Sequence, residues 1–135
     1  SVIKSAQPPS PINNADFDVQ RRAAMMQAIK NAMRQPSAGE QRELGLIEKI
    51  ECTNKGMFFH LKTQTQVFKL AAASPQSIQM RAYTPEAMQI QFGCNLKQVD
   101  IPIVFTFKPT SDPKTKSNGE IVALEFVPKS FILEK

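Results

Sequence analysis

The chain has 135 residues, of which 41% are hydrophobic and 21% are charged, so it has the composition of an ordinary globular protein with a buried core. Lysine and arginine total 17 against 12 acidic residues, and this excess of +5 is spread along the sequence. A nucleic acid or another anionic partner is therefore compatible with the charge but not required by it. No apolar run approaches the ~20 residues of a membrane-spanning helix.

Residues 1–15 have the composition of a flexible linker. The run Gln7-Pro8-Pro9-Ser10-Pro11 favours extended polyproline conformation and lacks the apolar area to fold alone. We expect it to join the domain to something upstream, with a Pro-rich ligand for a partner protein as the alternative. Because the sequence starts at Ser1 rather than Met, we also expect a processed or excised piece of a longer chain.

Residues 16–36 predict one amphipathic helix. Asp16 suits the N-cap, and Pro36 stops the helix. Apolar residues recur at helical spacing and form one stripe, which consists of Val19, Ala23, Met26, Ile29 and Met33. This stripe would pack on the β domain or on a neighbouring domain. The alternative is a partner-binding face, because methionine adapts to irregular surfaces. The residues of that face would be Val19, Met26, Ile29 and Met33.

Residues 43–135 predict a β domain of short strands separated by turns. The stretch 88–92 alternates apolar and amide side chains at every step, which is the period of a half-buried strand. Asn54 and Gly56 suit a tight hairpin turn. The expected strands cover residues 44–52, 57–62, 66–70, 78–83, 87–94, 101–107 and 120–127. In the last of them we expect Val122, Leu124 and Phe126 in the core and Glu125 facing water.

Such closely spaced strands indicate a small barrel or sandwich, and closure removes exposed strand edges, which favours a barrel. The predicted fold is therefore all-β, a small OB-like barrel of about five to seven antiparallel strands, with one N-terminal amphipathic helix. The predicted division of the chain is a linker over 1–15, a helix over 16–36 and a β-barrel over 43–135.

Cys52 and Cys94 are the two cysteines of the chain. Each continues the apolar phase of its predicted strand, so we expect both to point inward. Neighbouring strands or facing sheets can bring two Cα atoms to the roughly 4.4–6.8 Å that a disulfide needs. A bridge would indicate an oxidising compartment, periplasmic or secreted. The alternative is two buried free thiols, which would suit the cytoplasm.

No constellation of residues predicts catalysis or a cofactor. His60 is the single histidine, and no nucleophile elbow accompanies it. The two cysteines and His60 lack the spacing of a zinc site, the carboxylates are scattered, and the glycines are isolated. We therefore expect a protein that is not an enzyme, with no catalytic, cofactor-binding or metal-binding residues and no small-molecule substrate.

Binding is the function class that remains. OB barrels bind single-stranded nucleic acids with a basic groove and aromatic platforms, and aromatic residues lie among lysines in the middle of this chain. The nucleic-acid face would consist of Phe58, Lys62, Lys69 and Arg81. Aromatic residues in strands belong more often to a core, however, and the chain has no Trp and one Tyr. We therefore favour a protein partner or a neighbouring domain, with a nucleic acid as the alternative.

Four segments together resemble a known family. They are Leu46-Ile47-Glu48-Lys49-Ile50-Glu51-Cys52, Phe92-Gly93-Cys94, Val104-Phe105-Thr106-Phe107-Lys108-Pro109 and Gly119-Glu120-Ile121-Val122-Ala123-Leu124-Glu125-Phe126-Val127-Pro128. The pattern resembles a small bacterial OB-like β-barrel module found C-terminal to tetratricopeptide repeats, and the resemblance covers roughly residues 44–133. Asn95, where that family has Gly, is a departure. The family has no settled activity, so the resemblance implies an accessory or scaffolding module behind a protein-interaction array.

Overall fold

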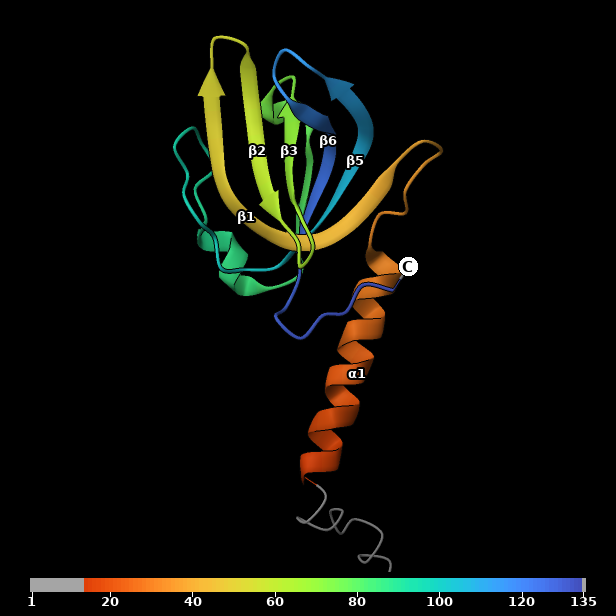
Figure 1. Cartoon of the computed structure of the whole chain (residues 1–135). Coiled ribbons are helices and arrows are strands. Elements are labelled where there is room, and N and C mark those ends of the chain that lie inside the picture. The colour runs from red at the N-terminus through yellow and green to blue at the C-terminus, as the bar shows by residue number, and fades with distance from the viewer. Residues whose placement is uncertain (1–13, 135) are drawn as a thin grey trace, which may run out of the picture. The chain divides into compact units, whose positions relative to one another are not determined.

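Residues 14–134, which the computed structural model describes, contain one α-helix, two short 3-10 helices and six strands (Figure 1). In chain order they are α1 (Asn14–Ala32), β1 (Gln41–Thr53), β2 (Gly56–Lys62), β3 (Val67–Ala72), η3 (Pro75–Ser77), β4 (Gln79–Ala82), η4 (Pro85–Gln89), β5 (Ile103–Asp112) and β6 (Ser117–Phe126). The chain divides into two compact units, residues 1–34 and residues 35–135. Most of the predicted linker lies outside the described residues.

The N-terminal helix is confirmed, but α1 ends at Ala32, before Pro36. Along the predicted apolar stripe, the Val19 side chain is 61% exposed, Met26 is half-buried, and Ile29 and Met33 are buried. The stripe therefore changes from exposed at the N-terminal end of α1 to buried at the C-terminal end.

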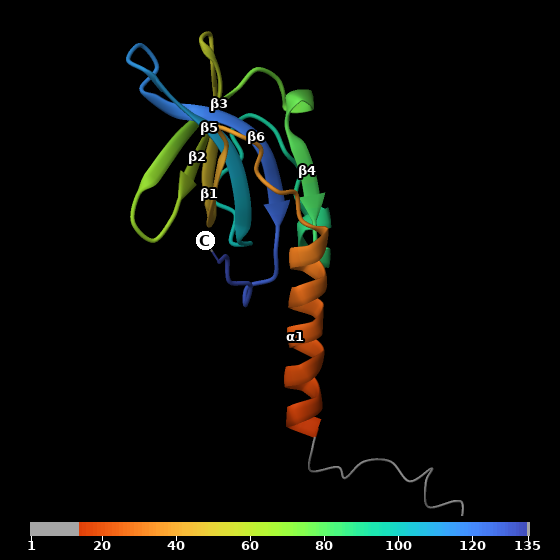
Figure 2. The same cartoon turned by 90° about the vertical axis from the view of Figure 1, so that its right-hand side faces the viewer.

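The six strands form one mixed sheet in the order β3-β2-β1-β5-β6-β4, and a further contact between β3 and β6 closes five of them into a ring. The expected all-β, OB-like class is thereby confirmed. Two pairings depart from the expected antiparallel arrangement, because both β3 and β4 run parallel to β6. Figure 2 shows β4 alongside the second half of β6.

β1 belongs to both halves of the ring. Figure 1 shows it as a long curved strand that passes from β5 to β2. It pairs with β5 through Gln41–Gly45 and with β2 through Leu46–Thr53. The β1–β2 register shifts between Ile47 and Lys49, which marks a β-bulge at Glu48. The bulge changes the side-chain phase, so the core residues of β1 are Ile47 and Ile50.

Gly45 lies where β1 passes from one partner strand to the other. A Cβ atom built there would collide with the main-chain carbonyl oxygen of Lys62. We expect Gly45→Ala to lower the free energy of unfolding by about 1–3 kcal/mol, because overpacking against backbone forces the two strands apart. Urea denaturation would measure the loss. Gly93→Ala is the matched control, since a Cβ atom there meets nothing within 4 Å. Equal stability of the two variants would contradict the close approach.

The core lies inside the ring and is dominated by phenylalanine. Phe59, Phe105, Phe107 and Phe126 are among its largest fully buried side chains. The Phe105 ring lies 5.5 Å from the Phe68 ring and 5.8 Å from the Phe107 ring, measured between centroids. Such aromatic contacts add to the free energy gained by burying apolar area. The inward positions of β2, β3, β5 and β6 meet in this cluster.

The strand predicted over 87–94 is absent from the structure. The 3-10 helix η4 extends to Gln89, and residues 90–102, which we call the covering segment, are irregular. Ile90 and Phe92 nevertheless pack against the core, and the Phe92 ring lies 5.6 Å from that of Phe126. Met88, expected on the same face, is 78% exposed. The alternation of apolar and amide residues over 88–92 therefore reflects the contacts of Ile90 and Phe92 with the core rather than a hydrogen-bonded strand.

Glu125 was expected to face water, and this expectation is wrong, because the side chain is only 1% exposed. Its neighbours in the last predicted core set, Leu124 and Phe126, are buried as expected, while Val122 is half-buried. Glu125 Oε2 accepts a hydrogen bond of 3.1 Å from the Tyr83 hydroxyl. Burial raises the pKa of that hydroxyl, and the nearby carboxylate acts in the same direction.

Candidate binding site

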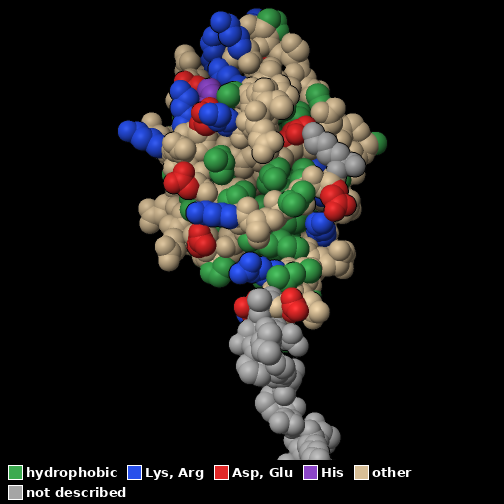
Figure 3. Space-filling view, turned by 60° about the horizontal axis from the view of Figure 1, so that its bottom comes forward, with side chains coloured by type: hydrophobic (Ala, Val, Ile, Leu, Met, Phe, Trp, Pro, Cys, Tyr) green, Lys and Arg blue, Asp and Glu red, His purple; other side chains and the backbone are tan. Residues whose placement is uncertain are grey.

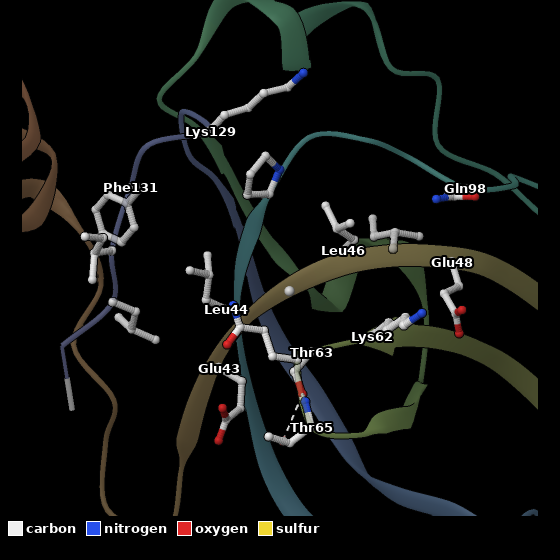
Figure 4. Close-up of a pocket in the computed structure, with 16 residues that line it drawn as sticks. Glu43, Leu44, Leu46, Glu48, Lys62, Thr63, Thr65, Gln98, Lys129 and Phe131 are labelled. Atoms are coloured by element: carbon white, nitrogen blue, oxygen red, sulfur yellow. Dashed lines mark hydrogen bonds between the residues drawn. The ribbon is translucent and has the colours of Figure 1, made fainter.

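A groove with a volume of about 950 Å³ lies beside β1 in the unit of residues 35–135. Its walls come from residues 43–48 of β1, residues 62–65 at the β2–β3 turn, residues 98 and 102 of the covering segment, and residues 129 and 131–133. Figure 4 shows Lys129 and Phe131 on one side of the groove and Glu48 and Gln98 on the other. Segments far apart in the sequence thus build one concave surface.

The β-bulge of β1 explains why leucine side chains line this groove. Ile47 and Ile50 belong to the core, whereas Leu44 and Leu46 are half-buried and line the groove. Because successive side chains of a strand point to opposite faces, residues 44 and 46 share the face away from Ile47. Leu44 and Leu46 therefore supply apolar surface to the groove.

Residues 129–133 supply the second apolar wall. The Phe131 side chain is buried, and its amide donates a 2.9 Å hydrogen bond to the Pro128 carbonyl. This anchor is followed by Ile132, which lines the groove and is 69% exposed. An exposed isoleucine in a concave site is available for contact with a ligand.

Charged and polar side chains complete the lining of the groove. Lys62 and Lys129 contribute ammonium groups, and Glu43 and Glu48 contribute carboxylates. The Thr63 hydroxyl is engaged in the β2–β3 turn, where it accepts hydrogen bonds from the amides of Thr65 and Gln66. No histidine or cysteine is found among the described lining residues. Apolar walls with charges of both signs suit binding of a ligand by shape and contact.

Cys52 and Cys94 lie at disulfide distance, with their Cα atoms 5.5 Å apart. The pairing is therefore as predicted, but both side chains are exposed rather than inward. Cys52 lies near the end of β1, and Cys94 belongs to the covering segment. Backbone hydrogen bonds continue the connection, from the Asn95 amide to the Ile50 carbonyl at 3.1 Å and from the Ile50 amide to the Leu96 carbonyl at 2.8 Å. The bridge fastens the covering segment to the edge of β1.

The residues of the alternative nucleic-acid face are only partly together. Phe58 and Lys62 lie on β2 and Lys69 on β3, whereas Arg81 lies on β4. The Lys69 ammonium lies 4.6 Å from the centre of the Phe58 ring and donates to the Thr115 carbonyl at 2.7 Å. Phe58 is only 3% exposed. The aromatic ring therefore offers little surface on which a base could stack.

His60 pairs with Glu51 across the β1–β2 ladder. Its Nε2 atom lies 3.0 Å from the Glu51 carboxylate oxygen Oε1. This hydrogen bond holds the pKa of the Glu51 carboxyl below its ordinary value, and Lys49 and Lys69 act in the same direction more weakly. Figure 3 shows lysine and arginine side chains in blue around the histidine in purple, together with acidic side chains in red. The histidine thus belongs to a mixed-charge surface between two strands.

Within residues 14–134, no three side chains of His, Cys, Asp or Glu lie close enough together to hold a metal ion. In the same part of the chain, no helix has the length and apolar character needed to cross a lipid bilayer. Neither the family models nor the curated proteins compared with this chain match it.

Proposed function

We propose that this chain is a non-catalytic interaction module that binds an extended segment of a protein partner, or of a neighbouring domain, in the groove beside β1. The observation that carries the proposal is the placement of Leu44 and Leu46, which line the groove instead of the core. Apolar side chains in a concave surface, flanked by charged groups, are the usual composition of a recognition site.

The charges of the groove favour a peptide over a polyanion. Lys62 and Lys129 are balanced by Glu43 and Glu48 along the lining. A phosphate backbone would meet repulsion from the two carboxylates, whereas a peptide can present both signs together with apolar side chains. The resemblance to the module behind tetratricopeptide repeats supports the same class, an accessory part of a larger bacterial protein. The paired cysteines support a periplasmic or secreted location.

A phage-displayed peptide library selected on this chain tests the proposal. We expect enriched peptides to bind the wild-type chain, and Ile132→Arg to weaken the binding by about tenfold or more, because a charge replaces exposed apolar surface of the groove. Ile132 is 69% exposed, so the substitution leaves the core intact. Isothermal titration calorimetry would measure both affinities.

Met88→Arg is the matched control for this experiment. Met88 is 78% exposed and does not belong to the lining of the groove. It receives the same substitution and should leave the peptide affinity unchanged. Peptides that bind both variants equally, or a library that yields no binder, would contradict the proposed site.

Single-stranded nucleic-acid binding is the second candidate, and the two lysines Lys62 and Lys69 on the paired strands β2 and β3 favour it. Fluorescence anisotropy with a labelled oligothymidylate, measured at increasing salt, distinguishes the two. Phosphate contacts would weaken steeply with salt and respond to Lys62→Ala and Lys69→Ala. Tight binding with that salt dependence, together with indifference to Ile132→Arg, would favour the nucleic acid.

A further inference from the structure

The covering segment forms part of the groove wall. Gln98 and Pro102 line the groove from this segment, and Leu44 and Leu46 line it from β1. The Val99 amide donates a 2.9 Å hydrogen bond to the Ile47 carbonyl. The position of this wall therefore depends on how firmly residues 94–99 are held to β1.

The attachment of residues 94–99 to β1 is one covalent bridge followed by single hydrogen bonds. The bridge joins Cys94 to Cys52, and the hydrogen bonds join Asn95 and Leu96 to Ile50 and Val99 to Ile47. The segment itself has no strand or helix, so after the bridge is opened it is held by these hydrogen bonds and by apolar packing, in which Leu96 and Val99 contact the core. Segments with few regular hydrogen bonds open at lower free energy than the strands they cover.

Both cysteine side chains are exposed, so a thiol can reach the bridge in the folded protein. We propose that the Cys52–Cys94 bridge is a redox switch for the groove: reduction by a thiol such as glutathione releases the covering segment while the ring of strands stays folded. This inference rests on the groove's proposed function as a binding site, and it names the regulation of that site.

The chemical step balances with two thiol molecules. The thiolate of one attacks a sulfur of the bridge, forms a mixed disulfide and releases the other cysteine as a thiolate. The second thiol attacks the mixed disulfide and releases the remaining cysteine. Two glutathione thiols become one glutathione disulfide, and Cys52 and Cys94 each gain one electron and one proton.

Amide hydrogen exchange, followed by NMR in oxidised and in reduced glutathione, tests the proposal. We expect the amides of Asn95 and Val99 to exchange about tenfold faster or more after reduction, while the amides of β2 keep their native chemical shifts and remain the slowest to exchange. The double variant Cys52→Ser with Cys94→Ser is the matched control. It should show the fast exchange without any reductant and no response to glutathione.

Three results would overturn the switch. The bridge could stay oxidised in reduced glutathione as long as the chain is folded. It could open without any change at Asn95 and Val99. Reduction could also remove the native chemical shifts of β2 together with those of the covering segment, which would mean that the bridge holds the whole fold together. The peptide experiment with Ile132→Arg is independent of these readouts, so failure of the groove as a binding site would be recognised separately.

Discussion

Replacing Cys52 and Cys94 together by serine is expected to lower the free energy of unfolding by about 4 kcal/mol, with a fall of the melting temperature on the order of 15 °C. The two cysteines are 42 residues apart in the sequence. A bridge over such a loop removes conformational entropy from the unfolded chain, and the variant regains that entropy. Guanidinium denaturation and differential scanning calorimetry would measure both quantities.

The reduced wild-type chain is the control for this substitution. Both cysteine side chains are exposed, so serine removes little packing, and the reduced wild type and the double variant should have similar stability. A loss of less than about 1 kcal/mol in the double variant would contradict the entropic role of the bridge.

Phe105→Ala is expected to destabilise the fold by about 3–5 kcal/mol, the largest effect of a single substitution that we anticipate. The Phe105 side chain is fully buried and contacts the rings of Phe68 and Phe107. Alanine would leave a cavity between β5 and the strands that face it, because the surrounding rings relax only partly. Urea denaturation would measure the loss.

Phe17→Ala serves as the comparison for Phe105→Ala. Phe17 lies on α1, and its side chain is 61% exposed. Truncation there removes an exposed ring and its contact with the Arg21 guanidinium, so stability should change by less than about 0.5 kcal/mol. Similar losses from both substitutions would mean that Phe105 is not at the centre of the core.

The strands that the sequence predicted well are those with strong local signals. The turn signal at Asn54 and Gly56 predicted a hairpin, and β2 begins at Gly56 and ends at Lys62 as expected within one residue. β1 and β5 were also located, but β1 extends beyond both predicted limits, and β5 begins two residues later and ends five residues later than predicted. Alternation and turn residues are local properties, so they identify a strand more reliably than its ends.

The covering segment was mispredicted because its alternation had another cause. Ile90 and Phe92 are apolar because they contact the core. Residues 90–94 nevertheless form no strand. Burial on one face of an irregular segment produces the same sequence period as a strand. Likewise, Glu125 follows the polar phase of β6 but lies on a face that is buried.

The groove could not be predicted from local sequence patterns. Leu44 and Leu46 line the groove because of the β-bulge at Glu48. No turn residue in the sequence indicates this bulge. Further lining comes from residues 98, 102, 129 and 131–133, which tertiary folding brings to β1. The pairing of Cys52 with Cys94 was predictable, because only two cysteines exist, whereas their exposure was not.

The position of β6 in the sheet governs the order in which this domain can form. β6 pairs with β5, closes the ring against β3 and carries β4, so its partners span the chain from Val67 to Asp112. During synthesis, β1, β2 and β3 would emerge from the ribosome long before β6. Until then, their core-facing side chains would lack the contacts that β6 provides. Such distant pairings slow folding, so a nascent chain would expose apolar surface of β1, β2 and β3 until β6 is synthesised.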